Sequence, residues 1–442
     1  MASLTSIKLG TKYLPKLRML DSLGEFLVAG EVIDKIRTVS PYPITPVDLG
    51  AIDSAVKSGT TLSFEQAFGG MLYVVSATNN FVRSLLFPNM PFEEAIAKGS
   101  YFLTLLAVKE AFIGLTYEEV SGLAAAGMVD IVYAPPLKEV TEFAGMGADR
   151  GWGTKKVKTI NVSTLSSVVL ASLGFVSMKH GSYGNTTCVG STDVLEQFGA
   201  CLCQNGPNEI KRLIETTGYW FNDAHSVKTL HYLSHLLMVE TVNHVVGPMT
   251  APVEKSTKLY KVMGVNHNVH PAVIARAYAQ LHRVGCVNLG GVVVLGGVDA
   301  VPTPMEASDP SWFRDHCYLD ELSPTATVVS FATGGTFLGV DVLVGSRPFG
   351  VSIREDAIKV PNNIETLMRA DEQALTGGPL AEYLACNAAL ALLSRKLKCE
   401  RASLLDLRED FHVALSAIES GKAMDKLNEY IRASGGERRL WL

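Results

Sequence analysis

The sequence has no long apolar run free of polar side chains, and it has no excess of positive charge. Its longest segment without a charged residue, Thr159 to Met178, is long enough to span a membrane, but it contains Asn161 and seven Ser or Thr residues. Those polar groups favour a buried segment of an α/β domain over a membrane span. A formal charge of −5 and a pI near 6.1 argue against a general nucleic-acid-binding protein.

Cysteine pairs with the spacing of a known motif are also lacking. The seven cysteines are an odd number and are scattered, which predicts reduced thiols in an intracellular compartment. Cys201 and Cys203 form the only close pair, and their spacing suits neither a zinc knuckle nor a thioredoxin-type motif. His231 and His235 could share one face of a helix, but no glutamate follows His231, so packing is favoured over a metal site.

Acidic residues are absent before Asp21, whereas Lys8, Lys12, Lys16 and Arg18 lie within the first twenty positions. This composition is typical of an amphipathic organelle-targeting segment, and it equally fits an ordinary basic extension. Because there is no long apolar core, a secretory signal is not expected. The sequence therefore predicts a cytoplasmic protein, with the mitochondrial or plastid matrix as the alternative.

The patterning of the chain predicts an α/β protein. With 442 residues, 47% apolar and 19% charged, it can bury a large core, and one large domain with a smaller one is expected. From residue 21 to about 128, apolar spacings of three and four predict helices, with a capping box at Thr116–Glu119. Asp130–Tyr133 and Gly291–Gly297 are predicted strands, and helices return from Leu380.

The stretch from Gly145 to Asp193 is rich in glycine and in hydroxyl side chains. Glycine permits positive φ and close approach of the backbone to a phosphate, and exposed N–H groups at a helix start favour anions. The apolar run Val168 to Val176 is predicted to be a strand that delivers Lys179 to a loop, and a helix should start after Gly190. These features predict a polyphosphate or sugar-phosphate site. The alternative is that the glycines only separate strands.

Four short motifs, in this order, resemble those of the glycosyltransferase family 3 proteins, the anthranilate phosphoribosyltransferases and pyrimidine nucleoside phosphorylases. The family patterns are GTGGD, N-x-S-T, KHG-N and S-G-S-x-D-x-L-E. They stand here as Gly145–Asp149, Asn161–Thr164, Lys179–Ser182 and Gly190–Glu196. The similarity runs from about Ile52 to Ala433 with insertions, so the chain is identified as a divergent member.

The resemblance implies a small all-helical N-terminal domain and a larger α/β domain with a central, mainly parallel sheet flanked by helices. The expected boundaries are an extension at 1–45, a helical domain at 46–128 completed by helices from about 205–245, and a phosphoribosyl-binding domain at 129–204 and 246–442. The family usually pairs through its helical domain. A homodimer is therefore expected, and a place in a larger assembly is an open alternative.

The resemblance also implies Mg²⁺-dependent transfer of ribose 5-phosphate from 5-phosphoribosyl 1-pyrophosphate to an aromatic or nitrogenous small-molecule acceptor. It gives no certain catalytic side chain. Mg²⁺ would be bound by Ser163, Asp320 and Glu321, and the acceptor by His180, Ser182 and Ser234. The donor would be bound by Gly145, Gly147, Asp149, Asn161, Ser163, Thr164, Lys179 and Ser191.

Departures from the family pattern bear on the acceptor. Met146 and Ala148 replace a hydroxyl residue and a glycine, and Ser182 replaces an asparagine. The acceptor-binding arginine of the family falls on Ser234, and losing such a charge-assisted contact would remove about 1.5–3 kcal/mol. We therefore expect an acceptor other than anthranilate. The alternatives are anthranilate phosphoribosyltransferase of tryptophan biosynthesis and a catalytically degraded member recruited as a structural subunit. A nucleoside phosphorylase is less favoured, because the K-x-S-x-G-G turn is missing.

The loop from Arg150 to Lys158 is longer than the family usually has, and it adds Lys155, Lys156 and Lys158. These lysines could steer an anionic substrate towards the site. A solvated loop is the commoner explanation of such a charge run.

Overall fold

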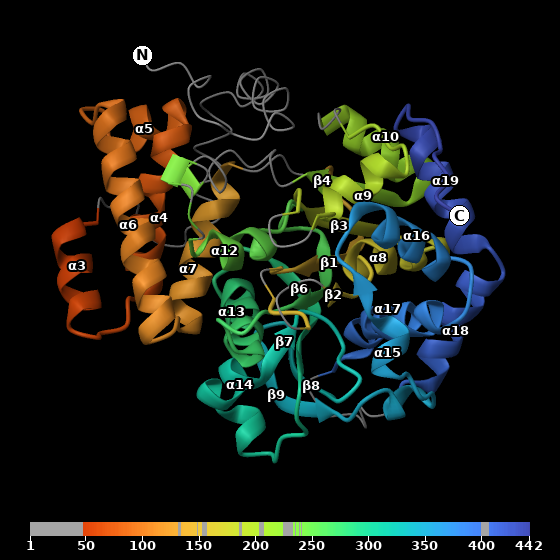
Figure 1. The fold of residues 1–442 in the computed structure, drawn as a ribbon. Helices are drawn as coiled ribbons and strands as arrows, with labels where there is room; N and C mark the ends of the chain where they lie inside the picture. Colours follow the sequence, from red (N-terminus) through yellow and green to blue (C-terminus); the bar gives the residue numbers. More distant parts are fainter. Residues whose placement is uncertain are drawn as a thin grey trace. The chain divides into compact units, whose positions relative to one another are not determined.

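The computed structural model describes residues 47–130, 134–147, 149–152, 157–184, 188–202, 207–223, 233–234, 236–237, 239, 241–398 and 406–442. The predicted N-terminal extension and the histidines at 231 and 235 lie outside them. The chain divides into two compact units (Figure 1). The helical unit is Met1–Tyr133, Ala224–Pro252 and Val284–Cys286, and the sheet unit is Ala134–Asp223, Val253–Arg283 and Val287–Leu442. Residues 207–223, assigned to the helical domain from the sequence, group with the sheet unit.

The helical unit is built around α4, which packs against α6 and α7. Glycines permit this close packing: a Cβ on Gly70 would lie 2.2 Å from the ring of Phe102, and one on Gly122 would lie 2.4 Å from the carbonyl oxygen of Phe64. Among the described residues, no helix is both long and apolar enough to cross a membrane. The helices of this unit are α3 (Leu49–Lys57), α4 (Phe64–Thr78), α5 (Asn80–Leu86), α6 (Phe92–Phe112), α7 (Tyr117–Gly127), the short η2 (Met128–Asp130) and α12 (Asn243–Met249).

A buried ion pair closes the turn before α7. Thr116 and Glu119 form the capping box predicted from the sequence. The Glu119 carboxylate also accepts a hydrogen bond from the Leu62 N–H at 2.8 Å and pairs with the Lys109 ammonium at 2.9 Å. Because all its acceptor sites face donors, this carboxylate can be buried inside the unit.

The sheet unit contains an eight-stranded sheet in the order β4-β3-β1-β5-β6-β8-β9, with β7 paired to β6. In this order, the five strands β4, β3, β1, β5 and β6 run parallel to one another. β7 and β8 pair antiparallel with β6, and β9 pairs antiparallel with β8. The strands are β1 (Glu139–Gly145), β3 (Ser177–Gly181), β4 (Tyr219–Asp223), β5 (Lys258–Gly264), β6 (Asn288–Val298), β7 (Cys317–Leu319), β8 (Ala326–Thr333) and β9 (Thr336–Leu343). A separate two-stranded sheet joins β2 (Val157–Lys158) to β10 (Val360–Pro361).

Helices cover both faces of the main sheet. Successive side chains of a strand point to opposite faces of the sheet, so the contacts of Thr141 and Glu142 on β1 show what covers each face. Thr141 accepts from Arg395 of α17, whereas Glu142 pairs with Lys261, whose ammonium lies 5.5 Å from the ring centre of Tyr278 on α13. The α/β class with a mainly parallel, helix-flanked sheet is therefore confirmed. The helices of this unit are α8 (Val162–Ser172), α9 (Ser191–Gln197), α10 (Pro207–Thr217), α13 (Pro271–Arg283), η4 (Glu306–Ser308), α14 (Pro310–His316), η5 (Arg347–Phe349), α15 (Glu355–Ile358), α16 (Ile364–Ala374), α17 (Pro379–Lys396), α18 (Arg408–Glu419) and α19 (Lys422–Ala433).

Two strand predictions differ from the structure. The strand expected at Asp130–Tyr133 falls mostly outside the described residues, and the strand that leads into the glycine turn is β1. The run Val168–Val176 is not a strand, because its first part completes α8 and the strand carrying Lys179 is the shorter β3. A buried apolar run cannot be assigned from periodicity alone, because a helix buried on all sides has the same pattern as a buried strand.

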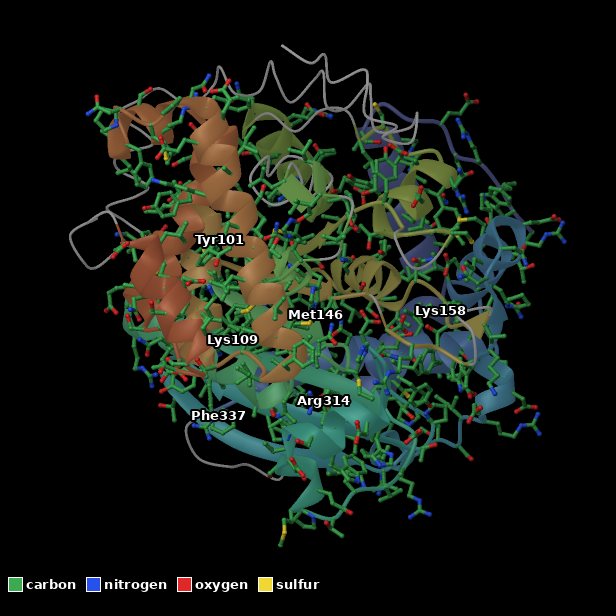
Figure 2. All side chains as sticks on the ribbon, turned by 60° about the vertical axis from the view of Figure 1, so that its left-hand side comes forward. Tyr101, Lys109, Met146, Lys158, Arg314 and Phe337 are labelled. Atoms are coloured by element: carbon green, nitrogen blue, oxygen red, sulfur yellow. The ribbon has the colours of Figure 1, made fainter. Side chains whose placement is uncertain are left out.

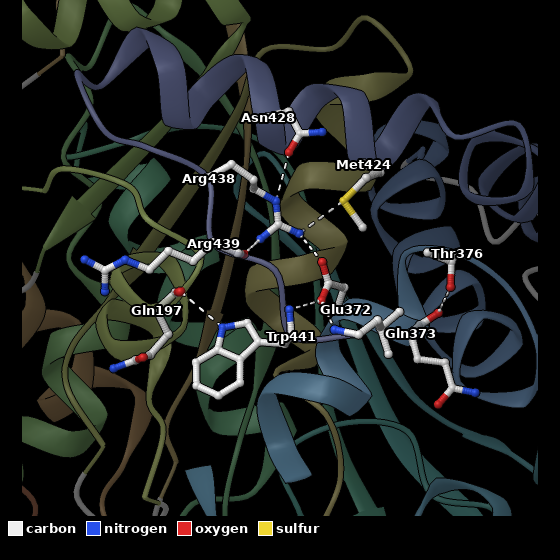
Figure 3. Close-up of polar contacts among 10 residues, drawn as sticks. Gln197, Glu372, Gln373, Thr376, Met424, Asn428, Arg438, Arg439 and Trp441 are labelled. Atoms are coloured by element: carbon white, nitrogen blue, oxygen red, sulfur yellow. Dashed lines mark hydrogen bonds and ion pairs between the residues drawn. The ribbon is translucent and has the colours of Figure 1, made fainter. Parts of the chain in front are cut away.

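The C-terminal tail, residues 436–442, joins α16 to the end of α9 (Figure 3). Glu372 of α16 accepts from the guanidinium of Arg438 and from the N–H groups of Trp441 and Leu442. On the α9 side, the Trp441 indole N–H donates to the carbonyl of Gln197 at 3.2 Å. The tail therefore crosslinks two helices whose other residues lie at the candidate site.

Candidate active site

The carboxyl ends of three parallel strands meet at one edge of the main sheet. β1, β3 and β5 end at Gly145, Gly181 and Gly264, and Gly145 is in register with Gly264. After β1 the chain adds β3 and β4 on one side, and it then returns to add β5 on the other side. In open α/β sheets, ligands bind at such a change of direction, outside the carboxyl ends of the strands.

Asp320 and Glu321, called the acidic doublet below, are predicted from the sequence to belong to the site. They lie against this edge of the sheet. The Gly147 N–H donates to Oδ2 of Asp320 at 2.9 Å, and Gly147 has a positive φ of +61°. A Cβ on Gly145 would lie 2.6 Å from the same carboxylate oxygen, and one on Gly264 would lie 1.6 Å from the carbonyl oxygen of Asp320. The glycines therefore allow the doublet, more than 170 residues away in sequence, to approach the first turn.

We expect Gly264→Ala to disturb this contact, because the added methyl group cannot fit beside the Asp320 backbone. Overpacking of this kind costs about 1–3 kcal/mol of unfolding free energy, and the displaced doublet should weaken binding of inorganic diphosphate about tenfold or more. Urea denaturation and calorimetric titration measure the two effects. Gly50→Ala, at an exposed position in α3, is the matched control. An unchanged diphosphate affinity in Gly264→Ala would contradict this packing argument.

Glu321 and Asp149 each contact a residue of the segment around β2. The Thr159 hydroxyl donates to Oε1 of Glu321, and the Lys158 ammonium pairs with the carboxylate of Asp149. Burial raises the pKa of Glu321 well above its usual range, and the charge of Asp320 adds to that shift. Lys158, labelled in Figure 2, is buried, with 4% of its surface exposed. The prediction of a solvated loop is therefore wrong for Lys158.

Met146, which replaces a hydroxyl residue of the family pattern, lies in the same turn (Figure 2). Its N–H donates to the carbonyl of Gly264 at 3.0 Å, and its side chain is buried. The neighbouring strand β5 therefore holds the main chain of this turn, and this hydrogen bond does not depend on which side chain stands at position 146.

The N-terminus of α8 carries three residues that are predicted to bind phosphate through amide or hydroxyl groups, Asn161, Ser163 and Thr164. Asn161 is the N-cap, and its main-chain N–H and its side-chain amide both donate to Asp371 at 2.7 Å. Ser163 and Thr164 follow in the first helical turn, with Ser163 partly exposed and Thr164 buried. Burial raises the pKa of Asp371 to about 7, and the two bonds from Asn161 oppose that shift.

Asp371→Ala should lower the unfolding free energy by about 1–3 kcal/mol, because it leaves two donors of Asn161 without their acceptor. The loosened cap should also weaken diphosphate binding, which titration calorimetry will measure. Glu365→Ala on the same helix is the control, since its surface pair with Arg369 contributes less than about 1 kcal/mol. Equal effects of the two variants would show that the cap does not depend on Asp371.

Lys179 and Ser191 meet over a glycine. A Cβ on Gly181 would lie 3.2 Å from Nζ of Lys179 and 2.7 Å from Oγ of Ser191, so both polar groups converge on this bare position. The Lys179 ammonium donates to the carbonyl of His180. Burial lowers the pKa of Lys179 to about 8, although the charges of Glu142 and Asp320 partly offset this effect.

Ser191 is the first residue of α9, and Asp193 fixes the loop before it. The Asp193 carboxylate accepts from the N–H groups of Gly184 at 2.7 Å and Gly190 at 2.9 Å. The Thr192 N–H donates to the carbonyl of Ser182 at 3.0 Å. The sequence comparison gave Asp193 no role of its own, and the structure shows that it ties the Ser182 loop to the helix start.

The three predicted acceptor residues are divided between the units. His180, at the end of β3, is buried, with Nδ1 3.9 Å from Oε1 of Glu142. The Ser182 hydroxyl donates to the carbonyl of Tyr183 at 3.2 Å. Ser234 belongs to the helical unit, where its hydroxyl contacts Oγ1 of Thr241 at 2.8 Å. The acceptor assignment therefore stays a prediction.

Asp320 and Glu321 offer the oxygen ligands that Mg²⁺ prefers, and each accepts one hydrogen bond from this chain. Within the described residues, no group of three or more His, Cys, Asp or Glu side chains is placed to hold a metal ion. Binding of Mg²⁺ by Ser163, Asp320 and Glu321 stays a prediction.

Comparison with known proteins agrees with this architecture. Residues 149–306 match the sequence profile described as "Glycosyl transferase family, a/b domain". Anthranilate phosphoribosyltransferase of Methanococcus vannielii is 28% identical over 346 residues, which cover 77% of this chain and 92% of the relative. The Aquifex aeolicus protein of the same name is also 28% identical, over 73% of this chain and 85% of its own.

Solved structures show the same fold. Anthranilate phosphoribosyltransferase from Saccharomyces cerevisiae, in complex with PRPP and Mg, has a TM-score of 0.65 at 20% identity, covering 88% of this chain and 98% of its own. The Thermus thermophilus enzyme has a TM-score of 0.60 at 22% identity, covering 87% and 99%. The family expected from the motifs is confirmed. The chain is therefore similar in sequence and fold to the anthranilate phosphoribosyltransferases, and its residues 149–306 match the α/β domain of a glycosyltransferase family.

Proposed function

We propose that this chain is a phosphoribosyltransferase that moves ribose 5-phosphate from 5-phosphoribosyl 1-pyrophosphate to a nitrogen atom of a small acceptor. The observation that carries the proposal is the convergence in the sheet unit. The acidic doublet approaches the Gly145–Gly147 turn, and Lys179 meets Ser191 at the end of β3. The choice of donor is supported by one of the solved structures named above, which contains 5-phosphoribosyl 1-pyrophosphate (PRPP).

The transfer breaks the bond between ribose C1 and the diphosphate oxygen while the acceptor nitrogen bonds to C1. The diphosphate leaves with the bonding electrons, so the protein has to hold two anionic groups and stabilise the leaving charge. The Lys179 ammonium and the Ser191 hydroxyl are suited to one anionic group. The first turn of α8, with Ser163 and Thr164, offers N–H and hydroxyl donors to another.

For the acceptor we propose an aromatic or nitrogenous amine other than anthranilate. Only the serine at position 234, where the family pattern has an arginine, supports this choice. The relatives found are named for anthranilate, so they do not support a different acceptor. The homodimer is likewise a proposal, which light scattering on purified protein would check.

Calorimetry with 5-phosphoribosyl 1-pyrophosphate, followed by an assay of diphosphate release with a panel of amines, tests the proposal. We expect donor binding, and release with one member of the panel. Release with anthranilate alone would restore anthranilate as the acceptor. No heat at millimolar donor, with or without Mg²⁺, would reject the enzyme and favour a structural subunit.

A further inference from the structure

The end of α9 is closed by the C-terminal tail. The carbonyl groups of three consecutive residues at this end accept hydrogen bonds from the tail. The pairs are Gln197 with the indole N–H of Trp441 at 3.2 Å, Phe198 with the N–H of Arg439 at 3.0 Å, and Gly199 with the N–H of Glu437 at 3.0 Å. Carbonyl groups at the C-terminus of a helix have no partner within the helix, so the tail supplies the donors that α9 lacks.

Two glycines allow the tail to lie this close to α9. Gly199 has a φ of +102°, and a Cβ on it would lie 1.7 Å from the carbonyl oxygen of Glu437. A Cβ on Gly436 would lie 2.0 Å from the carbonyl oxygen of Gly199. Neither position has room for a side chain, so the contact between the two segments requires both glycines.

The other side of the tail is held by Glu372 of α16 (Figure 3). Its buried carboxylate accepts from the guanidinium of Arg438 and from the main-chain N–H groups of Trp441 and Leu442. Hydrogen bonds to an ionised acceptor are about twice as strong as those between neutral groups. The tail is therefore fastened to α16 as well as to α9.

Both helices that the tail joins are connected to the candidate donor site. α9 has only seven residues and begins at Ser191, whose hydroxyl we propose as a donor ligand. In α16, Asp371 stands next to Glu372 and accepts from the main-chain and side-chain N–H groups of Asn161. A helix as short as α9 is not stable by itself in water, so the position of Ser191 depends on what fastens this helix.

We propose that the C-terminal tail sets the affinity of this chain for its donor, and that Trp441 and Glu372 are positioning residues of the donor site. With the tail fastened, Ser191 and Asn161 are held in the arrangement that binds the donor. With the tail loosened, this arrangement is one of several, and the apparent dissociation constant rises as its population falls. This inference rests on the proposed function, because it concerns the same donor site.

Titration calorimetry on the full chain, with 5-phosphoribosyl 1-pyrophosphate and Mg²⁺, tests the inference. Glu372→Gln should raise the dissociation constant of the donor about tenfold, because the amide has one acceptor oxygen and leaves Arg438 without its counter-charge. Trp441→Phe keeps an aromatic ring and loses the indole N–H, so it should raise this constant about threefold. In the diphosphate-release assay, KM for the donor should rise by the same factors while kcat stays unchanged, because saturating donor restores the arrangement.

Lys426→Met is the matched control. The Lys426 ammonium on α19 pairs with Glu429 and donates to the carbonyl of Thr217 at 2.8 Å, so this variant loosens the end of α10 and spares the contacts of the tail. Its donor affinity should stay within about twofold of the wild type. Hydrogen exchange adds a readout that needs no donor. The amides of residues 191–199 should exchange about tenfold faster in Glu372→Gln, and at the wild-type rate in Lys426→Met.

Three results would overturn the inference while leaving the proposed function intact. The first is a donor affinity within about twofold of the wild type in both folded tail variants. The second is an equal loss of affinity in Lys426→Met, which would indicate a general effect of lower stability. The third is unchanged exchange of α9 in Glu372→Gln. If the wild type does not bind the donor, the proposed function and the inference fail together. If Glu372→Gln misfolds, Trp441→Phe carries both measurements, because it removes no charge.

Discussion

Replacing Glu142 with Gln is expected to lower the free energy of unfolding by about 3–5 kcal/mol. Glu142 on β1 and Lys261 on β5 are in register, and their side chains pair at 2.6 Å with both fully buried. The amide would leave the Lys261 ammonium buried without a counter-charge, and it would remove a charge that also stabilises Lys179. Urea denaturation followed by circular dichroism will measure the loss.

The double variant Glu142→Met/Lys261→Met separates the ion pair from the packing. Replacing both charges with apolar groups of similar volume should restore most of the lost stability, because no charge is then buried alone. Glu139→Gln, at the more exposed start of the same strand, is the control for a weaker pair with Arg395. A double variant as unstable as Glu142→Gln would mean that the cost lies in packing and not in charge.

Replacing Lys179 with Met is expected to weaken binding of diphosphate or donor about 100-fold, or about 2.7 kcal/mol. The reason is that its ammonium is buried beside Gly181 and Ser191, where screening by water is weak. Calorimetric titration measures the change, and thermal melting checks that the variant folds. Lys258→Met, at the exposed start of β5, is the charge-matched control. An affinity within about threefold of the wild type would exclude Lys179 from the donor site.

The same lysine predicts a pH dependence. Since burial lowers the pKa of Lys179 to about 8, its ammonium is fully present below that pH and is lost as the pH rises through it. Diphosphate affinity of the wild type should therefore fall above about pH 8, and the ratio of wild-type to Lys179→Met affinity should shrink over the same range. This ratio cancels the ionisation of diphosphate itself. A constant ratio from about pH 7 to 9 would contradict the assignment.

Much of the fold follows from local sequence patterns. The capping box before α7, the buried strand β6 and the helices after Leu380 have signals that lie within one element, and all are present. The acidic doublet was found only through its resemblance to a family motif, since an isolated Asp-Glu pair carries no local signal. The run Val168–Val176 was assigned wrongly, because periodicity cannot distinguish a buried helix from a buried strand.

The residues that sequence reasoning missed act through partners far along the chain. Asp371 is 210 residues from Asn161, and Lys261 is 119 residues from Glu142. Neither pair has a spacing rule, because the sheet topology alone brings the partners together. Lys158 was considered, but only as part of a charge run, and its buried stem lies beside Gly151, where a Cβ would meet it at 3.1 Å. A glycine opposite a long side chain is the one signal that could have suggested it.

The C-terminal tail has a consequence for how the protein is made. Glu372 receives its last two N–H donors from Trp441 and Leu442, and Asp371 beside it holds Asn161. These residues follow every residue of the donor site in the chain, so α16 and α9 can be joined only after residues 436–442 have been synthesised. Deletion of 436–442 would spare every residue of the donor site and still leave two of its helices unfastened.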